Sequence, residues 1–191
     1  MKTIYNFYKM LRLIKMDLSR YTGDLWNPFA FFSTMFIHPG MFMSIIYRFE
    51  RYLIYESNAL FKVVGFFFYP LYYFISYYCL SYKINPKVKI GGGLFLHNRE
   101  IIMTENISIG KYFTCMGQTT IGKHIEKELG SLTIGDNVTL GVGAKIVAKG
   151  KMFIADNITI GANGVVTKSL EKKYGVYVGI PVKLIKTKPK K

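Results

Sequence analysis

Histidine and cysteine are the reactive residues whose positions in this chain are easiest to interpret, because each occurs so rarely. The three histidines are His38, His97 and His124, and the two cysteines are Cys79 and Cys115. Imidazole titrates near neutral pH, so histidine is the usual general base for a hydroxyl nucleophile. A thiol can carry an acyl group, and three histidines can hold zinc. The elements that position these side chains decide between these chemistries.

A six-residue repeat organises residues 84–166. Aliphatic residues recur at this step, and Gly or Ala follows many of them. The predicted inward positions are Ile84, Ile90, Leu96 and Ile102, then, after one extra residue, Ile109, Cys115 and Ile121, and after a break Ile134, Leu140, Ile146, Ile154, Ile160 and Val166. A step of six does not fit the period of an α-helix. It predicts short strands joined by tight turns, three to a coil, with stacked coils burying the aliphatic ladder.

The repeat gives each reactive residue a predicted environment. Cys115 falls on an inward position, where a small apolar side chain fills the coil, so we expect it to be structural. His97 follows an inward position and should project from the coil; periodicity alone fits a surface histidine as well as a base. His124 falls in the break after Gly122, which we interpret as a protruding loop. His38 lies outside the repeat, and we expect a structural role for it.

Five stretches, in order, resemble the hexapeptide-repeat acyltransferases, above all serine acetyltransferases and bacterial polysaccharide O-acetyltransferases. They are residues 90–102 (IGGGLFLHNREII), 118–122 (QTTIG), 134–144 (IGDNVTLGVGA), 160–168 (IGANGVVTK) and 179–183 (GIPVK). Any one of them would be a weak signal, but the ordered set is specific. The resemblance implies a mainly β fold: a left-handed parallel β-helix of hexapeptide repeats with an N-terminal α-helical region.

The resemblance also implies a reaction, the direct transfer of an acetyl group from acetyl-CoA to a hydroxyl in a ternary complex. His97 occupies the position of the family's catalytic histidine and is the expected general base. The positions that match cofactor contacts, in a groove between subunits of a homotrimer, are Gly122, Gly143, Ala144, Gly161, Ala162, Lys168, Pro181 and Lys183. Acceptor contacts are expected from Asn98, Glu100, Gln118 and His124. The glycines also suit tight turns without any cofactor.

Departures from the serine acetyltransferase pattern surround His97. Leu96 stands where that family has Asp, Lys83 where it has an upstream acidic residue, and Glu100 where it has Gly. These differences remove most of the amino-acid-binding apparatus. They favour a carbohydrate acceptor, a sugar hydroxyl of a surface polysaccharide such as a capsule or of its precursor. Glu100 is also a candidate for orienting His97, since a base usually has a third group holding it.

Three alternatives remain beside this interpretation. They are a serine acetyltransferase of cysteine biosynthesis, a zinc hydratase on the same fold, and a non-enzymatic scaffold on a membrane. The hydratase needs three histidine ligands, and the repeat region holds only His97 plus His124 in a loop, so we expect no metal site. The presence of His97 within its motif argues against the scaffold.

Composition divides the chain near residues 82–83. Aromatic residues crowd the first part and glycine fills the second, which predicts a helical region at 1–82, a β-helix at 83–185 and a basic tail at 186–191. The net charge of +15 indicates anionic partners. No zinc-finger, helix-turn-helix or RNP-like motif supports nucleic acid as that partner. Two cysteines and an N-terminus unlike a signal peptide favour a cytoplasmic protein.

Two amphipathic helices are expected in the first part of the chain. Residues 5–21 show the helical period, and residues 41–55 follow a Pro-Gly pair. The apolar face of the first is expected to carry Leu11, Ile14 and Leu18, and the polar side of the second Arg48 and Arg51.

Residues 63–80 contain no charged side chain but have Pro70 in their middle. Their length is near the minimum for a membrane span. Their tyrosines suit a membrane interface better than a hydrocarbon centre. Three interpretations stay open: a span, an in-plane peripheral element on the inner face of the cytoplasmic membrane, or a helix pair packed within an oligomer such as a dimer of trimers.

Overall fold

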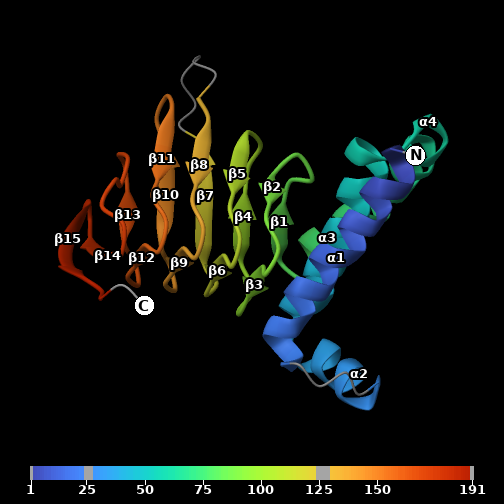
Figure 1. Ribbon diagram of the computed structural model, residues 1–191, viewed down its shortest axis with the longest axis horizontal. Helices are drawn as coiled ribbons and strands as arrows, with labels where there is room; N and C mark the ends of the chain where they lie inside the picture. Colours follow the sequence, from blue (N-terminus) through green and yellow to red (C-terminus); the bar gives the residue numbers. More distant parts are fainter. Residues whose placement is uncertain (1, 24–27, 124–129, 190–191) are drawn as a thin grey trace.

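The computed structural model describes residues 2–23, 28–123 and 130–189, in a helical region and a coil of short strands (Figure 1). The helices are α1 (Lys2–Thr22), α2 (Pro28–Ile37), α3 (Pro39–Arg51) and α4 (Ala59–Tyr73), with π-helical extensions η1 (Tyr52–Glu56) and η2 (Phe74–Cys79). Figure 1 shows α1 and α3 against the first coil, while later strands stack away from them. The helices thus cap one end of the coil.

Three sheets form the walls of the coil, and successive strands enter them in turn. The first holds β1 (Tyr82–Ile84), β4 (Ile101–Met103), β7 (Thr119–Lys123), β10 (Lys145–Ala148) and β13 (Val165–Val166). The second holds β2 (Lys89–Ile90), β5 (Ile107–Ile109), β8 (Leu132–Ile134) and β11 (Met152–Ile154). The third holds β3 (Phe95–Leu96), β6 (Thr114–Cys115), β9 (Thr139–Leu140), β12 (Thr159–Ile160), β14 (Gly175–Gly179) and β15 (Val182–Thr187). Apart from antiparallel β15, all the strand pairs are parallel, and the predicted β-helix with an N-terminal helical region is confirmed.

The inward ladders of the second and third sheets follow the predicted positions. The second sheet stacks Ile90, Ile109, Ile134 and Ile154 in register, and the third stacks Leu96, Cys115, Leu140, Ile160 and Tyr177. All of these side chains are buried. Each fully buried aliphatic side chain contributes about 1.5–3 kcal/mol, so the ladder is the main source of stability for the coil.

The first sheet corrects one predicted position. Its inward ladder is Ile84, Met103, Ile121, Ile146 and Val166. Ile102 was predicted to point inward, and this is wrong: Met103 is 1% exposed, whereas Ile102 is only half-buried. The extra residue of this coil lies in the corner between Leu96 and Ile101, not after Ile102. The corner that carries His97 is therefore one residue longer than the corresponding corners of the later coils.

A buried ion pair joins the helices to the first coil. Arg48 Nε on α3 lies 2.9 Å from Asp17 Oδ2 on α1, with the two side chains 2% and 0% exposed. Arg48 also donates to the carbonyl oxygen of Gly91 at 2.6 Å, and Asp17 Oδ1 accepts from the backbone N–H of Gly93 and Leu94. Arg48 was predicted on the polar side of its helix, and this is wrong because its charge is satisfied internally.

The apolar face of α1 is the predicted one at Leu18, which is buried, and at Ile14, which packs against a buried cluster, but not at Leu11. Met10, Asp17 and Leu18 are its buried residues, and Leu11, predicted on the apolar face, is 43% exposed. The face is set by the Asp17 contact to the first coil. A sequence pattern that counts only apolar residues misses a buried carboxylate.

At the C-terminus, β15 runs antiparallel to β14 and continues through Thr187. The backbone N–H of Lys188 then donates to the Tyr174 carbonyl at 2.8 Å. The ordered strand therefore extends two residues into the stretch predicted as a basic tail.

Candidate active site

His97 lies where β3 ends and the chain turns toward the first sheet. The preceding residue, Leu96, is fully buried, and alternation along the strand places His97 outside the coil. Its side chain is exposed, and its backbone N–H donates to the Cys115 carbonyl at 2.9 Å. The imidazole is thus attached to a fixed corner and open to a ligand.

Asn98 fixes the orientation of this imidazole. Its Nδ2 donates to the Met116 carbonyl at 3.2 Å, and its Oδ1 lies 3.0 Å from His97 Nδ1. An amide oxygen only accepts hydrogen bonds, so we assign the proton to Nδ1 and the lone pair to Nε2. A neutral imidazole with a free Nε2 is the form that a general base requires. Glu100, the predicted orienting residue, makes no such hydrogen bond in the described part of the chain, and Asn98 takes its place.

A cavity of about 610 Å³ opens on the outer face of the first sheet, beside the same corner. It is lined by Tyr77, Ser81, Lys83, Glu100, Ile102, Gln118, Thr120, Gly143, Lys145 and Asn163. Three of these, Glu100, Gln118 and Gly143, were predicted site residues. His97 shares the corner with Glu100 but does not line the cavity.

The floor of the cavity is a row of outward residues on neighbouring strands. Lys83 pairs in register with Ile102, Ile102 with Thr120, and Thr120 with Lys145. Each stands one residue before an inward position of the ladder. With the correct strand register, the sequence would have predicted this row. The sequence prediction instead placed the extra residue of the coil after Ile102, and so put Ile102 inside the coil.

The rim of the cavity is a column of residues with left-handed backbone conformation. They are Ser81, Glu100, Gln118, Gly143 and Asn163, with φ values of 59°, 63°, 50°, 72° and 55°. Positive φ is uncommon outside glycine; here it turns the chain from η2 into β1 at Ser81, and from the third sheet into the first at the other four positions. A Cβ on Gly143 would lie 2.1 Å from Asn163 Oδ1, so a side chain there would have to displace the Asn163 amide as well as adopt a positive φ.

Charges of both signs meet in this cavity. Lys145 Nζ donates to the Gly143 carbonyl at 3.2 Å, and Lys83 Nζ lies 3.9 Å from the ring centroid of Tyr77. The exposed carboxylate of Glu100 belongs to the same lining. The cavity therefore offers two ammonium groups and one carboxylate to a small polar ligand.

Several predicted cofactor residues lie along the corner that begins at His97. Backbone hydrogen bonds connect His97 to Cys115, Met116 to Leu140, Gly141 to Ile160, and Gly161 to Tyr177. Gly161 and exposed Ala162 thus stand on the same edge, three coils from the base. Lys183 pairs with Val178 at the end of this edge.

Other predicted cofactor residues are placed differently. Ala144 is fully buried inside the coil, so its small size serves packing and it does not face a ligand. Lys168 and Pro181 are exposed near the C-terminal end, and Gly122 is half-buried in β7. His124, predicted to contact the acceptor, lies outside the described residues.

Cys115 carries no nucleophilic chemistry. It is fully buried, and its Sγ lies 2.6 Å from Thr119 Oγ1. Burial raises the pKa of the thiol to about 11, which keeps it protonated at neutral pH. Within residues 2–23, 28–123 and 130–189, no three His, Cys, Asp or Glu side chains gather where they could hold a metal ion.

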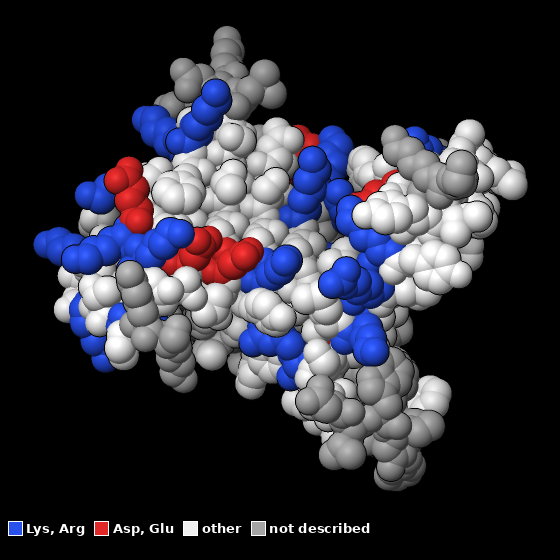
Figure 2. Space-filling view, in the orientation of Figure 1, with Lys and Arg blue, Asp and Glu red and all other residues white. Residues whose placement is uncertain are grey.

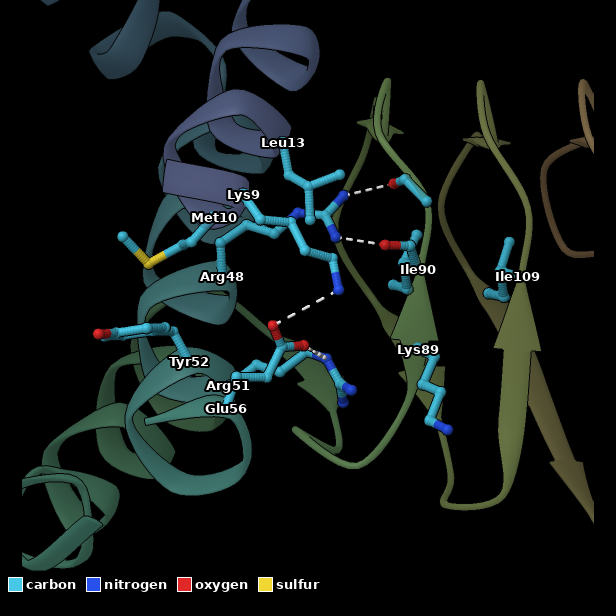
Figure 3. Close-up of a pocket in the computed structure, with 11 residues that line it drawn as sticks. Lys9, Met10, Leu13, Arg48, Arg51, Tyr52, Glu56, Lys89, Ile90 and Ile109 are labelled. Carbon is cyan, nitrogen blue, oxygen red and sulfur yellow. Dashed lines mark hydrogen bonds and ion pairs between the residues drawn. The ribbon is translucent and has the colours of Figure 1, made fainter. Parts of the chain in front are cut away.

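Figure 3 shows a second cavity, of about 440 Å³, between the helices and the second sheet. Three of its four cations are engaged: Lys9 and Arg51 lie 3.7 and 3.4 Å from Glu56, and Arg48 is bound as described above, while the fourth, Lys89, is exposed. No histidine lines it. We interpret it as part of the junction between helices and coil.

Comparison with known proteins identifies similar chains. No family model matches this chain. A serine acetyltransferase of Staphylococcus aureus (strain Mu50 / ATCC 700699) is 37% identical over 115 residues, which cover 59% of this chain and 52% of that protein. One of Staphylococcus epidermidis is 36% identical over 114 residues, with the same coverage. The chain therefore spans about half the length of the curated relatives it matches.

Solved structures share the fold over nearly the whole chain. A serine acetyltransferase of Neisseria gonorrhoeae superposes with a TM-score of 0.74 at 21% identity, covering 96% of this chain and 69% of that one. A serine acetyltransferase in complex with CoA superposes with a TM-score of 0.72 at 21% identity, covering 96% and 72%. At this identity the likeness establishes the architecture, including the helical region.

Proposed function

We propose that this chain, whose fold and relatives fit the hexapeptide-repeat acetyltransferase superfamily in its serine acetyltransferase-like branch, transfers the acetyl group of acetyl-CoA to a hydroxyl. One observation carries the proposal: an exposed imidazole on a rigid corner, held by Asn98 with its Nε2 free. That is the group an acyl transfer to a hydroxyl needs most.

The chemical step requires this base, a correctly placed thioester, and hydrogen-bond donors for the oxyanion that develops on the thioester carbonyl. His97 Nε2 takes the proton of the acceptor hydroxyl as the oxygen attacks the thioester carbonyl. The tetrahedral intermediate collapses, the carbon–sulfur bond breaks, and the imidazolium returns its proton to the CoA thiolate. Because Cys115 is buried and protonated, we infer direct transfer without an acyl-enzyme.

L-serine is the acceptor that the relatives favour, in place of the carbohydrate expected from the sequence. The charges of the cavity support this choice. A zwitterion bearing a hydroxyl could pair its ammonium with Glu100 and its carboxylate with Lys83 or Lys145. The cavity also adjoins the corner that carries His97.

A sugar hydroxyl is the second candidate acceptor, on a specific observation. Lys83 and Leu96 occupy positions where serine acetyltransferases have acidic residues, and Lys83 lies in the cavity. A neutral sugar would use the hydroxyl and amide groups of Thr120, Gln118 and Asn163.

For acetyl-CoA we propose the edge that runs from His97 past Gly161 and Ala162 to Lys183. Its small side chains would let a pantetheine arm approach the backbone, and the lysine would meet a phosphate. A neighbouring subunit of a homotrimer would close the other side of this groove, as the resemblance implies.

The test is an acceptor panel with the full chain. CoA release from acetyl-CoA is followed with L-serine, free sugars and nucleotide sugars, and products are identified by mass spectrometry. Turnover with L-serine and formation of O-acetylserine support the first acceptor; turnover only with sugars supports the second. Absence of turnover with every acceptor, by folded protein that still binds CoA, would overturn the proposed activity.

A further inference from the structure

The helical rod α4–η2 carries an apolar surface that the rest of the fold leaves uncovered. It spans the 21 residues Ala59–Cys79, which are mostly apolar, and most of their side chains are exposed. Phe66 and Phe67 are each 73% exposed, Leu60 is 71% exposed and Tyr78 66%. A helix that is apolar nearly all round is normally buried in protein or in lipid. In the described part of the chain nothing covers this one.

We propose that the outward face of α4–η2, together with the start of α1, docks in the plane of an anionic phospholipid bilayer. The first turns of α1 extend the surface, with Ile4 at 62%, Tyr5 at 70% and Tyr8 at 67% exposure. Aromatic side chains with a polar edge are enriched at the level of lipid headgroups. Tyrosines gather toward the η2 end of the rod and phenylalanines toward the middle of α4.

We infer docking in the plane of the bilayer because one side of the rod packs against the rest of the fold. Gly65 packs so closely on Leu53 that a Cβ would come within 2.8 Å of Leu53 Cβ. Tyr72 is buried and donates from its hydroxyl to the Ile84 carbonyl at 2.6 Å. These contacts fix the rod to η1 and to the first strand over its length. A rod fixed in this way can offer a bilayer its free face without crossing it.

The charges around this surface favour an anionic bilayer over a second copy of the chain. Within residues 2–23 and 28–79, each acidic side chain is buried or paired: Asp17 is 0% and Glu50 2% exposed, and Glu56 bonds Lys9 and Arg51. The other exposed charges there are basic, from Arg12, Lys15 and Lys62. Two copies meeting through this surface would bring like charges together, whereas anionic lipid would neutralise them, at about 1 kcal/mol for each basic residue.

Figure 2 shows how the charged side chains are distributed on one face of the molecule. Lys and Arg gather where the helices border the coil, and the far end of the helical region is mostly uncharged. A groove of about 430 Å³ between α1, α3 and α4–η2 continues the apolar surface inward. Its lining is aliphatic and aromatic apart from Glu50, so an acyl chain can enter it.

Vesicle flotation of the full chain tests the proposal. We expect binding to phosphatidylglycerol-containing vesicles, weaker binding to phosphatidylcholine alone, and release by alkaline carbonate. The variant F66S/F67S should lower binding by roughly tenfold or more, since each Phe side chain contributes 1.5–3 kcal/mol when fully buried. The control is F153S, which removes a 44% exposed aromatic from the coil and should bind like the wild type. V63S, at a 55% exposed position, is a milder second variant with the same expected direction.

Three results would overturn the proposal. One is a wild type that does not float with anionic vesicles, and another is undiminished binding by F66S/F67S. The third is resistance to carbonate, which would indicate a span. A variant that only splits a larger oligomer, with no vesicle binding by the wild type, would assign the surface to contacts between copies. CoA release is measured alongside, so that a failure of the acetyltransferase proposal is recognised separately.

Discussion

Asn98 and His97 form one hydrogen-bonded unit: Asn98 Oδ1 lies 3.0 Å from His97 Nδ1, and Asn98 Nδ2 is held by the Met116 carbonyl at 3.2 Å. Two consecutive hydrogen bonds thus reach from the next coil to the imidazole. Asn98 is a positioning residue, because it acts on the acceptor only through His97.

Replacing Asn98 tests this role. Asn98→Ala should lower kcat by about 10–100-fold with little change in the KM for acetyl-CoA, because the base loses its orientation but the cofactor edge is intact. Asn98→Asp should recover part of the loss, since a carboxylate oxygen also accepts from Nδ1. It should also move the acid limb of the pH profile to higher pH, because the carboxylate favours the imidazolium. Equal losses in both variants with an unmoved profile would contradict a positioning role.

The Asp17–Arg48 pair should be essential for stability. Arg48→Leu leaves a buried carboxylate without its partner, and we expect a loss of about 3–5 kcal/mol in the free energy of unfolding. The matched control is Lys173→Ala, which breaks the exposed Lys173–Asp156 pair at 2.7 Å and should change the free energy of unfolding far less. Urea unfolding followed by circular dichroism measures both. Similar small losses would mean that the buried pair does not anchor the helices.

Glu50 should make stability depend on pH. Burial raises the pKa of its carboxyl to about 7, and its Oε1 has no hydrogen-bond partner in the described structure. Folding therefore favours the protonated form, so this contribution is fully present below about pH 4.5 and is lost as pH rises through about 7. Glu50→Gln should flatten this fall and stabilise the protein at pH 8 by about 1–3 kcal/mol. Thermal melts of the wild type and Glu50→Gln from pH 5 to 8 test this prediction. If the melting temperatures of the two proteins change with pH in the same way, Glu50 is not the source of the pH dependence.

Alanine substitutions at two glycines distinguish a glycine needed for the backbone conformation from one that contacts the cofactor. Gly143→Ala should destabilise by about 1–3 kcal/mol, because φ is +72° and the added Cβ would meet Asn163. At Gly122 the nearest atom to an added Cβ is Thr104 Cγ2 at 3.5 Å, an ordinary contact. Gly122→Ala should therefore melt like the wild type but raise the KM for acetyl-CoA if the cofactor approaches there. An unchanged KM would leave Gly122 as a residue of strand β7 with no cofactor contact.

The sequence allows the coil to be predicted because burial follows a simple count. Ile84, Cys115 and Ile160 occupy the predicted positions. The count fails at Ile102, because a periodic pattern cannot say in which corner an extra residue is accommodated. The extra residue lies in the corner that carries His97. Because it was placed elsewhere, the row of outward residues from Lys83 to Lys145, which forms the floor of the cavity, was not predicted.

Polar partners inside the fold are the second kind of feature that the sequence hides. Arg48 on an amphipathic helix suggests a solvated side chain, and only the three-dimensional position of Asp17 reverses this. Asn98 was predicted to contact the acceptor, but its pairing with His97 depends on Met116 in the next coil. Long-range hydrogen bonds of this kind have no local sequence pattern.

The most direct test of the account is steady-state CoA release by His97→Asn, a substitution that removes Nε2 as a base while keeping a polar side chain. With the acceptor identified for the wild type, we predict that kcat falls by about 10²–10⁴-fold while the KM for acetyl-CoA and the melting temperature are unchanged. A variant that retains turnover within about tenfold of the wild type, with the fold intact, would contradict His97 as the general base.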